Sequence, residues 1–109
     1  MDECLFCRIQ KEDSPKVYED ELIVAFNDIA PKAPVHILII PREHIVSAAR
    51  ITPEHGALLA HLWTKIPVIA KDAGLTDFRV VTNAGSGAGQ SVDHLHFHLI
   101  GGGPLNIVL

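Results

Sequence analysis

Long apolar runs are missing from this chain of 109 residues. The apolar stretch Val35–Ile40 is interrupted by His36 and ends at Pro41, far short of the ~20 residues that a membrane-spanning helix needs. The stretch Met1–Asp13 is charged and contains no apolar segment of the kind found in signal peptides. We therefore expect a cytoplasmic protein without a membrane partner.

An excess of basic residues is missing as well. The chain has 9 Lys and Arg residues against 13 Asp and Glu residues, which gives a net charge of −4. An acidic chain without a basic stripe is a poor candidate for binding long nucleic acid, although loop amides and imidazoles can still bind one small phosphate compound. Hydrophobic residues make up 48% of the chain, enough to bury a core, so we expect residues 1–109 to form a single domain.

Cysteine is scarce, and the 2 cysteines, Cys4 and Cys7, have the spacing C-x-x-C. In a cytosolic chain this spacing favours a metal site or a redox pair over a structural disulfide. A redox motif of this type follows a strand and opens a helix, whereas no strand precedes Cys4, so we favour a metal site. The alternative is a pair of small buried residues without a metal.

Alternating and β-branched apolar residues indicate five candidate strands. The first two form a hairpin, and the third, which is rich in Ile and Val, is expected at the centre of the sheet. The segments are 17–18, 22–27, 35–40, 78–83 and 92–100.

A long helix is predicted between the third and fourth strands. Thr52 is a typical N-cap residue, Pro53 follows at the first helical position, and Gly74 ends the pattern. Apolar residues recur at helical spacing between these ends, and we expect the stripe that includes Trp63 to lie in the core. Pro67 falls inside the pattern and predicts a bend or a break into two pieces. The order of the elements predicts an α+β domain with a mainly antiparallel sheet.

Three of the 7 histidines alternate with apolar residues near the C-terminus: His94, His96 and His98. A strand has a side-chain period of two, so these histidines would share one face and the intervening apolar residues would face the core. The preceding glycine-rich loop lets backbone amides approach an anion. Further donors flank it at Asn83, Gln90 and Ser91, so the segment favours a phosphoryl centre, although not of the P-loop type.

Two other interpretations of these histidines remain open at this point. They could be exposed residues on a solvated strand face. They could also form a three-histidine catalytic zinc site with an open coordination position.

The stretch "HLHFHLI" resembles the signature of the histidine-triad nucleotide-binding family, in which three histidines alternate with apolar residues. The segments "CLFCRI", "VYEDELIVAFNDIAPKAPVHILIIPREHI" and "FRVVTNAGSGAGQSV" resemble blocks of its Hint branch, in the zinc-carrying bacterial type, over residues 4–102. The resemblance implies a five-stranded sheet with one long and one short helix. It also implies a homodimer, in which the long helix and the following strand join two sheets into one of ten strands.

The resemblance implies a hydrolase of purine nucleoside phosphoramidates. His96 would attack the α-phosphate and form a covalent nucleotidyl-histidine, which water then hydrolyses to the nucleoside monophosphate. His98 would hold the phosphate oxygens, His36 would contact the surroundings of the nucleophile, and no metal is required for this chemistry. The implied nucleotide contacts are Asp28 on the ribose, Phe26 and Ile29 on the base, and Asn83, Gly89, Gln90 and Ser91 on the phosphate and leaving group.

Several alternatives accompany these assignments. Another enzyme of the superfamily would hydrolyse dinucleoside polyphosphates or transfer nucleotidyl groups. A non-enzymatic module would bind nucleotide without turnover. Asp28 could simply form a turn, and His36 could be a core histidine whose hydrogen bonds are satisfied.

The resemblance also completes the cysteine pair with His44 and His94. Two thiolates and two imidazoles make a closed tetrahedral zinc site of the structural type. In that case His94 must turn toward the N-terminal segment although it shares a face with His96 and His98.

Overall fold

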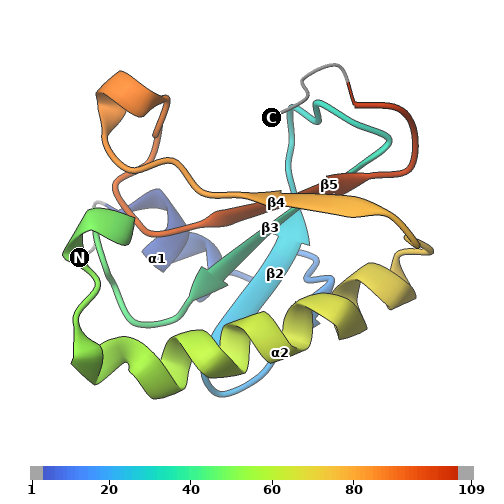
Figure 1. The fold of residues 1–109 in the computed structure, drawn as a ribbon. Helices are drawn as coiled ribbons and strands as arrows, with labels where there is room; N and C mark the ends of the chain where they lie inside the picture. Colours follow the sequence, from blue (N-terminus) through green and yellow to red (C-terminus); the bar gives the residue numbers. More distant parts are fainter. Residues whose placement is uncertain (1–3, 106–109) are drawn as a thin grey trace.

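A computed structural model describes residues 4–105 and contains one five-stranded sheet in the order β1-β2-β3-β5-β4, with every neighbouring pair antiparallel (Figure 1). The strands are β1 (Tyr18–Glu19), β2 (Ile23–Asn27), β3 (Val35–Pro41), β4 (Phe78–Val81) and β5 (Phe97–Gly101). The helices are α1 (Leu5–Ile9) and α2 (Gly56–Asp72), with short 3₁₀ turns at Ala48–Arg50, Pro53–His55 and Ser86–Ala88. The predicted α+β class and the central position of β3 are confirmed.

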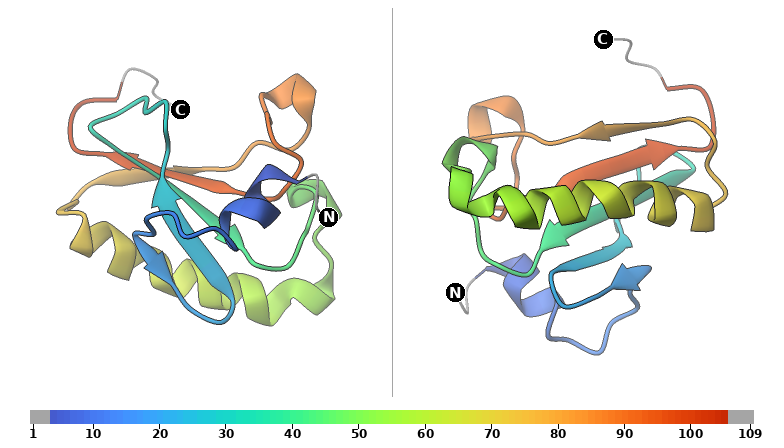
Figure 2. Two further views of the ribbon diagram at one scale, coloured as in Figure 1. Left: turned by 180° about the vertical axis from the view of Figure 1, so that it is seen from behind. Right: turned by 60° about the horizontal axis from the view of Figure 1, so that its bottom comes forward.

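The two faces of the sheet are covered by different helices (Figures 1 and 2). Residues of β2 and β3 alternate between a core shared with α2, which includes Ile37 and Ile39, and a second cluster with Phe6 of α1, which includes Leu38 and Ile40. Because both faces are buried, these strands read as nearly continuous apolar runs. Within residues 4–105, neither helix combines the length and apolar character needed to cross a membrane.

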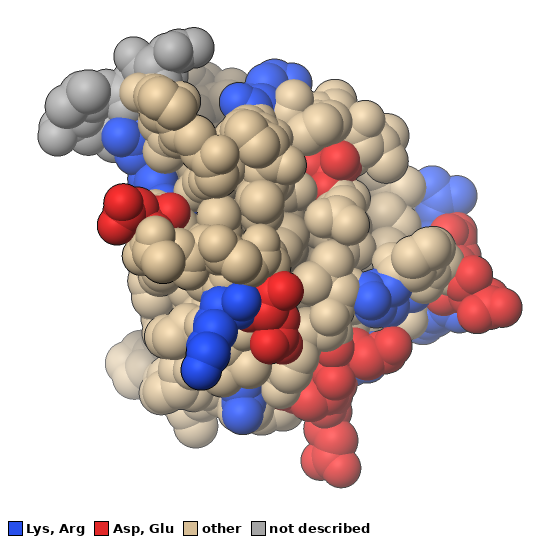
Figure 3. Space-filling model, turned by 90° about the vertical axis from the view of Figure 1, so that its right-hand side faces the viewer, with Lys and Arg blue, Asp and Glu red and all other residues tan. Residues whose placement is uncertain are grey.

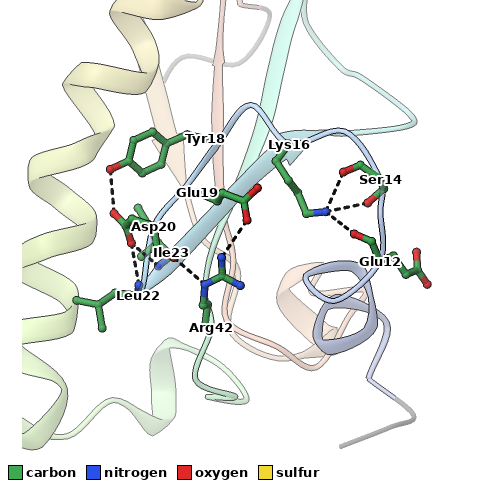
Figure 4. Close-up of polar contacts among 9 residues, drawn as sticks. All are labelled: Glu12, Ser14, Lys16, Tyr18, Glu19, Asp20, Leu22, Ile23 and Arg42. Carbon is green, nitrogen blue, oxygen red and sulfur yellow. Dashed lines mark hydrogen bonds and ion pairs between the residues drawn. The ribbon is translucent and has the colours of Figure 1, made fainter.

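The β1–β2 turn is organised by Asp20 (Figure 4). Its Oδ1 accepts hydrogen bonds from the backbone N–H groups of Leu22 (2.8 Å) and Ile23 (3.0 Å). Its Oδ2 accepts from the Tyr18 hydroxyl at 2.8 Å and lies 2.7 Å from Nε2 of His61 on α2. Burial alone would raise the pKa of this carboxyl, but these hydrogen bonds outweigh burial and hold the pKa well below its usual range.

Helix α2 is continuous through Pro67, so the alternative of a break into two pieces is wrong. Pro67 is exposed, as is Trp63 four residues earlier, so the carbonyl that Pro67 leaves without a helical donor lies on the solvent side. Trp63 itself is 49% exposed, which corrects its expected place in the core, and its ring packs edgewise on Phe97 at 5.8 Å. The buried stripe of α2 consists of Leu62, Ile66, Ile69 and Ala70.

Strand β5 begins five residues later than the predicted segment 92–100. The backbone before Phe97 makes contacts outside the sheet ladder: the Leu95 N–H donates to the Ile45 carbonyl (2.6 Å), and the Thr82 hydroxyl donates to the His96 carbonyl (2.8 Å). The alternation nevertheless persists, because Leu95, Phe97 and Leu99 all lie in the core shared with α2. The three histidines therefore face the α1 side.

Candidate active site and metal centre

The hydrogen bonds of His96 define its tautomer. Its Nδ1 lies 2.7 Å from the backbone carbonyl of His94, and because a carbonyl only accepts, Nδ1 carries the proton. The lone pair of the neutral ring is consequently on Nε2. The side chain is buried and its ring lines a pocket on the α1 side of the sheet, so His96 presents an imidazole nitrogen suited to nucleophilic attack.

His36 and His98 form a directed hydrogen-bond chain beside His96. The Lys32 backbone N–H donates to Nδ1 of His36 (2.9 Å), which therefore bears a lone pair. The proton of His36 is on Nε2, and this N–H donates to Nδ1 of His98 at 2.9 Å. The remaining nitrogen of His98, Nε2, is thus a hydrogen-bond donor. The β3–β5 register makes His36 and His98 diagonal neighbours, because they lie opposite Ile100 and Leu38.

Both imidazoles of this chain are neutral near pH 7. Burial lowers the pKa of His98 to about 4, assisted by the neighbouring His96 and His36 and opposed by Asp28. Burial also lowers the pKa of His36, which the Asp28 carboxylate partly offsets and Lys32 reinforces. His98 can therefore donate a hydrogen bond to a phosphoryl oxygen without becoming a cation.

Asp28 contacts both a turn and the histidine chain. Its Oδ1 accepts from the Ala30 N–H (2.8 Å), and its Oδ2 lies 3.4 Å from Nε2 of His36. The interpretation of Asp28 as a turn-forming acid is therefore correct, and the same carboxylate also lies beside the candidate active site.

Two hollows adjoin His98. The first is a largely apolar pocket of about 220 Å³ that also contains His96. The second is more open and shares Asp28, Ser91 and His98 with the first. Predicted nucleotide contacts in the first pocket are Phe26, Asp28, Ile29 and Ser91, while Asn83 and His36 line the second.

Gln90 and Gly89 do not line either hollow. The buried Gln90 amide accepts from the Gly85 N–H (2.7 Å) and donates to the carbonyls of Val46 (2.7 Å) and Val92 (2.9 Å). Its side chain therefore closes the glycine-rich loop that precedes Ser91, and the phosphate contact of Gln90 stays a prediction. Gly89 has φ +98°, a backbone conformation that favours glycine.

The predicted metal ligands are brought together from three segments. Donor atoms of Cys4, Cys7, His44 and His94 all lie within 4.8 Å of one another. Nδ1 of His94 lies 3.4 Å from Sγ of Cys4 and 3.5 Å from Sγ of Cys7, and Nδ1 of His44 lies 3.3 Å from Sγ of Cys7. Zinc–sulfur and zinc–nitrogen bonds at a tetrahedral angle separate the two ligand types by about 3.6 Å. The four residues therefore fit a zinc ion.

The orientation of His94 supports the same assignment. Its Nε2 donates to the Pro41 carbonyl (2.8 Å), which leaves the Nδ1 lone pair facing the two sulfur atoms. Burial, and secondly the neighbouring Cys4 thiol, raises the pKa of Cys7, because a second negative charge is unfavourable at this place. A cation bound between the two sulfur atoms would stabilise both thiolates.

Neither alternative metal site agrees with the hydrogen bonds. A catalytic zinc on His94, His96 and His98 is contradicted by the Nδ1 of His94, which faces the cysteines. Asp28, His36 and His98 also lie close enough to share a cation. However, Nε2 of His36 carries a proton and has no lone pair to offer a metal. These three residues therefore form a hydrogen-bond chain.

The sequence interpretation missed Phe6 and Lys32. The Phe6 ring meets the His96 ring edge to face, with centroids 5.0 Å apart and planes at 86°. Its only signal in the sequence is its place between the two cysteines. Lys32 lines the second hollow and supplies the N–H that fixes the His36 tautomer, which no residue-type pattern indicates.

Comparison with known proteins agrees with this arrangement. A family model described as "Scavenger mRNA decapping enzyme C-term binding" matches residues 3–103. Protein HitA of Neisseria gonorrhoeae is 49% identical over 104 residues, covering 93% of this chain and 97% of that protein. The purine nucleoside phosphoramidase of Escherichia coli (strain K12) is 38% identical over 112 residues, covering 99% and 94%. The 14 kDa zinc-binding protein of Zea mays is 44% identical over 107 residues, covering 94% and 84%.

A solved structure shows the same architecture. The HIT family hydrolase from Clostridium thermocellum matches with a TM-score of 0.90 and 40% sequence identity, covering 98% of this chain and 99% of that chain. Fold and histidine pattern define the class together: an antiparallel five-stranded sheet, with three alternating histidines on the α1 side that lie in β5 and in the segment leading into it. The chain belongs to the histidine-triad (HIT) family.

Proposed function

We propose that this protein hydrolyses purine nucleoside phosphoramidates through a covalent nucleotidyl-histidine on His96. The observation that carries the proposal is the bond from Nδ1–H of His96 to the His94 carbonyl at 2.7 Å, which assigns the remaining lone pair to Nε2 of a side chain that lines the pocket. Similarity to a hydrolase and to a purine nucleoside phosphoramidase supports the same class of reaction.

The reaction proceeds in two displacements at phosphorus. In the first, the Nε2 lone pair of His96 forms a bond to the α-phosphorus as the phosphorus–nitrogen bond breaks. The electron pair of that bond stays on the leaving amine, which takes one proton from solvent. In the second, a water oxygen bonds to phosphorus, the electron pair returns to Nε2, and the water releases one proton.

Neighbouring groups assist both displacements. The Nε2–H of His98 donates to a non-bridging phosphoryl oxygen, and the chain from Lys32 through His36 keeps that proton on Nε2. The apolar pocket with Phe26 accepts the purine, and Asp28 accepts from the ribose hydroxyls.

The metal of the Cys4–Cys7–His44–His94 centre is zinc in this proposal, and its role is structural. All four positions of a tetrahedral zinc are taken by protein atoms, so no position is open for substrate or water. The relative from Zea mays, a zinc-binding protein by name, supports this choice.

The proposed assembly is a homodimer joined through α2 and β4. Strand β4 is an edge strand of the sheet, and Trp63, Val68 and Phe78 are exposed apolar residues on these two elements. A second copy that pairs at this edge would extend the sheet to ten strands. Light scattering should give twice the chain mass, and Phe78→Lys should yield monomers; a monomeric wild type would contradict this assembly.

The surface favours a small ligand over a long nucleic acid. On the face shown in Figure 3, Lys and Arg side chains are separated by Asp, Glu and uncharged residues. Such an interleaved surface gives little attraction to a phosphate backbone.

The central experiment compares wild type with His96→Asn on an adenosine 5′-phosphoramidate of a simple amine. Asparagine retains an N–H near the position of Nδ1 but has no counterpart of Nε2. We expect wild type to release AMP and to show one added adenylyl group by intact mass after a quench in alkaline denaturant, which preserves the phosphorus–nitrogen bond to histidine, and His96→Asn to show neither. The control His55→Asn removes a histidine outside the site and should retain turnover. Normal turnover in His96→Asn would contradict the covalent mechanism.

Hydrolysis of dinucleoside polyphosphates is a second candidate, and Lys32 favours it. Lys32 lines the second hollow together with His98, and its Nζ, which donates to the Ala30 carbonyl (3.0 Å), is a cation that can attract a polyphosphate leaving group. Turnover of diadenosine tetraphosphate faster than that of the phosphoramidate would favour this candidate. Tight AMP binding without turnover of either compound would indicate a nucleotide-binding module.

A further inference from the structure

The His96 ring is held from two directions. Its Nδ1–H donates to the His94 carbonyl (2.7 Å), which fixes one edge of the ring. The Phe6 ring meets the His96 ring edge to face, with centroids 5.0 Å apart and planes at 86°, and this contact fixes the tilt of the imidazole. Such contacts prefer a defined angle, so each restrains the rotation of the imidazole.

Both restraints originate in the metal centre. Phe6 lies between Cys4 and Cys7 in the stretch "CLFC", and two residues separate the sulfur ligands. His94 supplies a ligand nitrogen with its side chain and the hydrogen-bond acceptor with its backbone. An ion that draws the four ligands together therefore sets the positions of both groups that hold His96.

Helix α1 depends on this centre for its position. It has 5 residues, whereas isolated helices need roughly 12–15 residues to be even marginally stable in water. Its first turn is capped by a ligand atom, because the Cys7 N–H donates to Sγ of Cys4 at 3.4 Å. Two further contacts hold α1 and the residue after it against the sheet: the apolar packing of Phe6 and Ile9, and the Gln10 amide, which donates to the Arg42 carbonyl at 3.1 Å.

We propose that Phe6 is a positioning residue through which occupancy of the Cys4–Cys7–His44–His94 centre controls the orientation of His96. The kinetic consequence rests on the function proposed above, whereas the orientation of the ring does not. Without metal, α1 loosens, Phe6 withdraws from the imidazole, and Nε2 of His96 points toward the phosphorus in a smaller fraction of molecules.

A matched pair of variants separates this role from simple pocket lining. Phe6→Leu preserves an apolar side chain but removes the ring that meets His96. Phe26→Leu removes a ring from the same pocket, and Phe26 contacts Phe6 at 5.5 Å but makes no ring pair with His96 among residues 4–105. We expect Phe6→Leu to lower kcat by roughly tenfold with metal bound, and Phe26→Leu to raise KM with kcat within about twofold. Equal changes of kcat in the two variants would overturn the proposal.

Metal removal then tests the coupling. In wild type, chelation should lower kcat by about the same factor as Phe6→Leu, while in Phe6→Leu chelation should lower it further by less than about twofold. Equal losses in both proteins, or abolished turnover in both, would overturn the proposal, and abolished turnover would indicate a catalytic metal. Far-UV circular dichroism identifies samples that have unfolded; for those, the comparison of metal-loaded variants decides.

A spectroscopic measurement makes the test independent of substrate. Histidine ring ¹H–¹⁵N spectra of the protein labelled at histidine nitrogen report the Nδ1–H of His96, assigned by its loss in His96→Asn. We expect this signal to shift or broaden both on chelation of wild type and in metal-loaded Phe6→Leu, and to stay in place in Phe26→Leu. An unchanged signal in chelated, folded wild type would overturn the proposal, even if phosphoramidates prove not to be substrates.

Discussion

The Nε2–H of His36 donates to Nδ1 of His98 across 2.9 Å, although the two residues are 62 positions apart in the chain. The direction of this bond follows from the Lys32 N–H, which occupies the other nitrogen of His36. His98 is thereby left with a donor on Nε2 at the junction of the two hollows.

This relationship predicts different outcomes for two substitutions of His36. His36→Asn cannot reach Nδ1 of His98, so we expect kcat for the phosphoramidate to fall about tenfold, the equivalent of one hydrogen bond of about 1.4 kcal/mol. His36→Gln places an amide donor near the former Nε2 and should regain part of that loss. Steady-state kinetics measure both, and equal kcat values in the two variants would contradict the proposed direction of the chain.

The lowered pKa of His98 predicts how stability depends on acidity. Burial, with His96 and His36 nearby, lowers the pKa of His98 to about 4 in the folded protein, against about 6.5 in an unfolded chain. Between these values the unfolded state binds a proton that the folded state does not. The contribution of the neutral His98 to the free energy of unfolding should therefore be complete above about pH 6.5, and it should decline as the pH falls toward about 4.

The variant His98→Asn removes this contribution. Its Tm should fall less steeply than that of wild type between about pH 6.5 and about pH 4. His36 and His94 also have pKa values lowered by burial, so the slope should decrease without vanishing. Differential scanning fluorimetry measures the slopes, and a slope in His98→Asn equal to that of wild type would refute the assignment.

Much of the candidate site could be predicted from residue spacing. The alternation of the histidines identified their common face, and the spacing of the cysteines indicated a metal site. His44 and His94 were added as ligands by the family resemblance. The sequence did not indicate that β5 begins only at Phe97, because the preceding backbone bonds to Ile45 and Thr82, which are distant in the chain. The use of Gln90 to close its own loop likewise depends on the carbonyl of Val46, 44 positions away.

Asp20 is predicted to stabilise the fold through its contacts at the turn between β1 and β2 (Figure 4). Asp20→Asn weakens the contacts with Tyr18 and His61, and hydrogen bonds to a charged group contribute about 1.5–3 kcal/mol each. Because these contacts share one carboxylate, we expect a net loss of about 1–2 kcal/mol at pH 7, or roughly 4–16 °C in Tm.

The acid dependence provides the check on Asp20. Its pKa is lowered in the folded protein, so its contribution is complete above about pH 5 and declines as the pH falls below the unfolded value near 3.9. The Tm difference between wild type and Asp20→Asn should therefore narrow below about pH 4. Glu21→Gln, an exposed neutralisation in the same turn, should leave Tm within about 2 °C at every pH. A constant difference in Asp20→Asn would argue against a role for the charged form.

Loss of metal is predicted to destabilise the protein, because the proposed role of the ion is structural. Elemental analysis of gently purified protein should find close to one zinc per chain, and a value near zero would contradict the four-ligand assignment. A ligand present at about 1,000 times its Kd stabilises the folded state by about 4 kcal/mol, so chelation should lower Tm by at least about 10 °C. Cys7→Ser removes the sulfur that contacts both His44 and His94, so its Tm should already be low and should respond little to the chelator. A chelator response in Cys7→Ser as large as that of wild type would place the ion elsewhere.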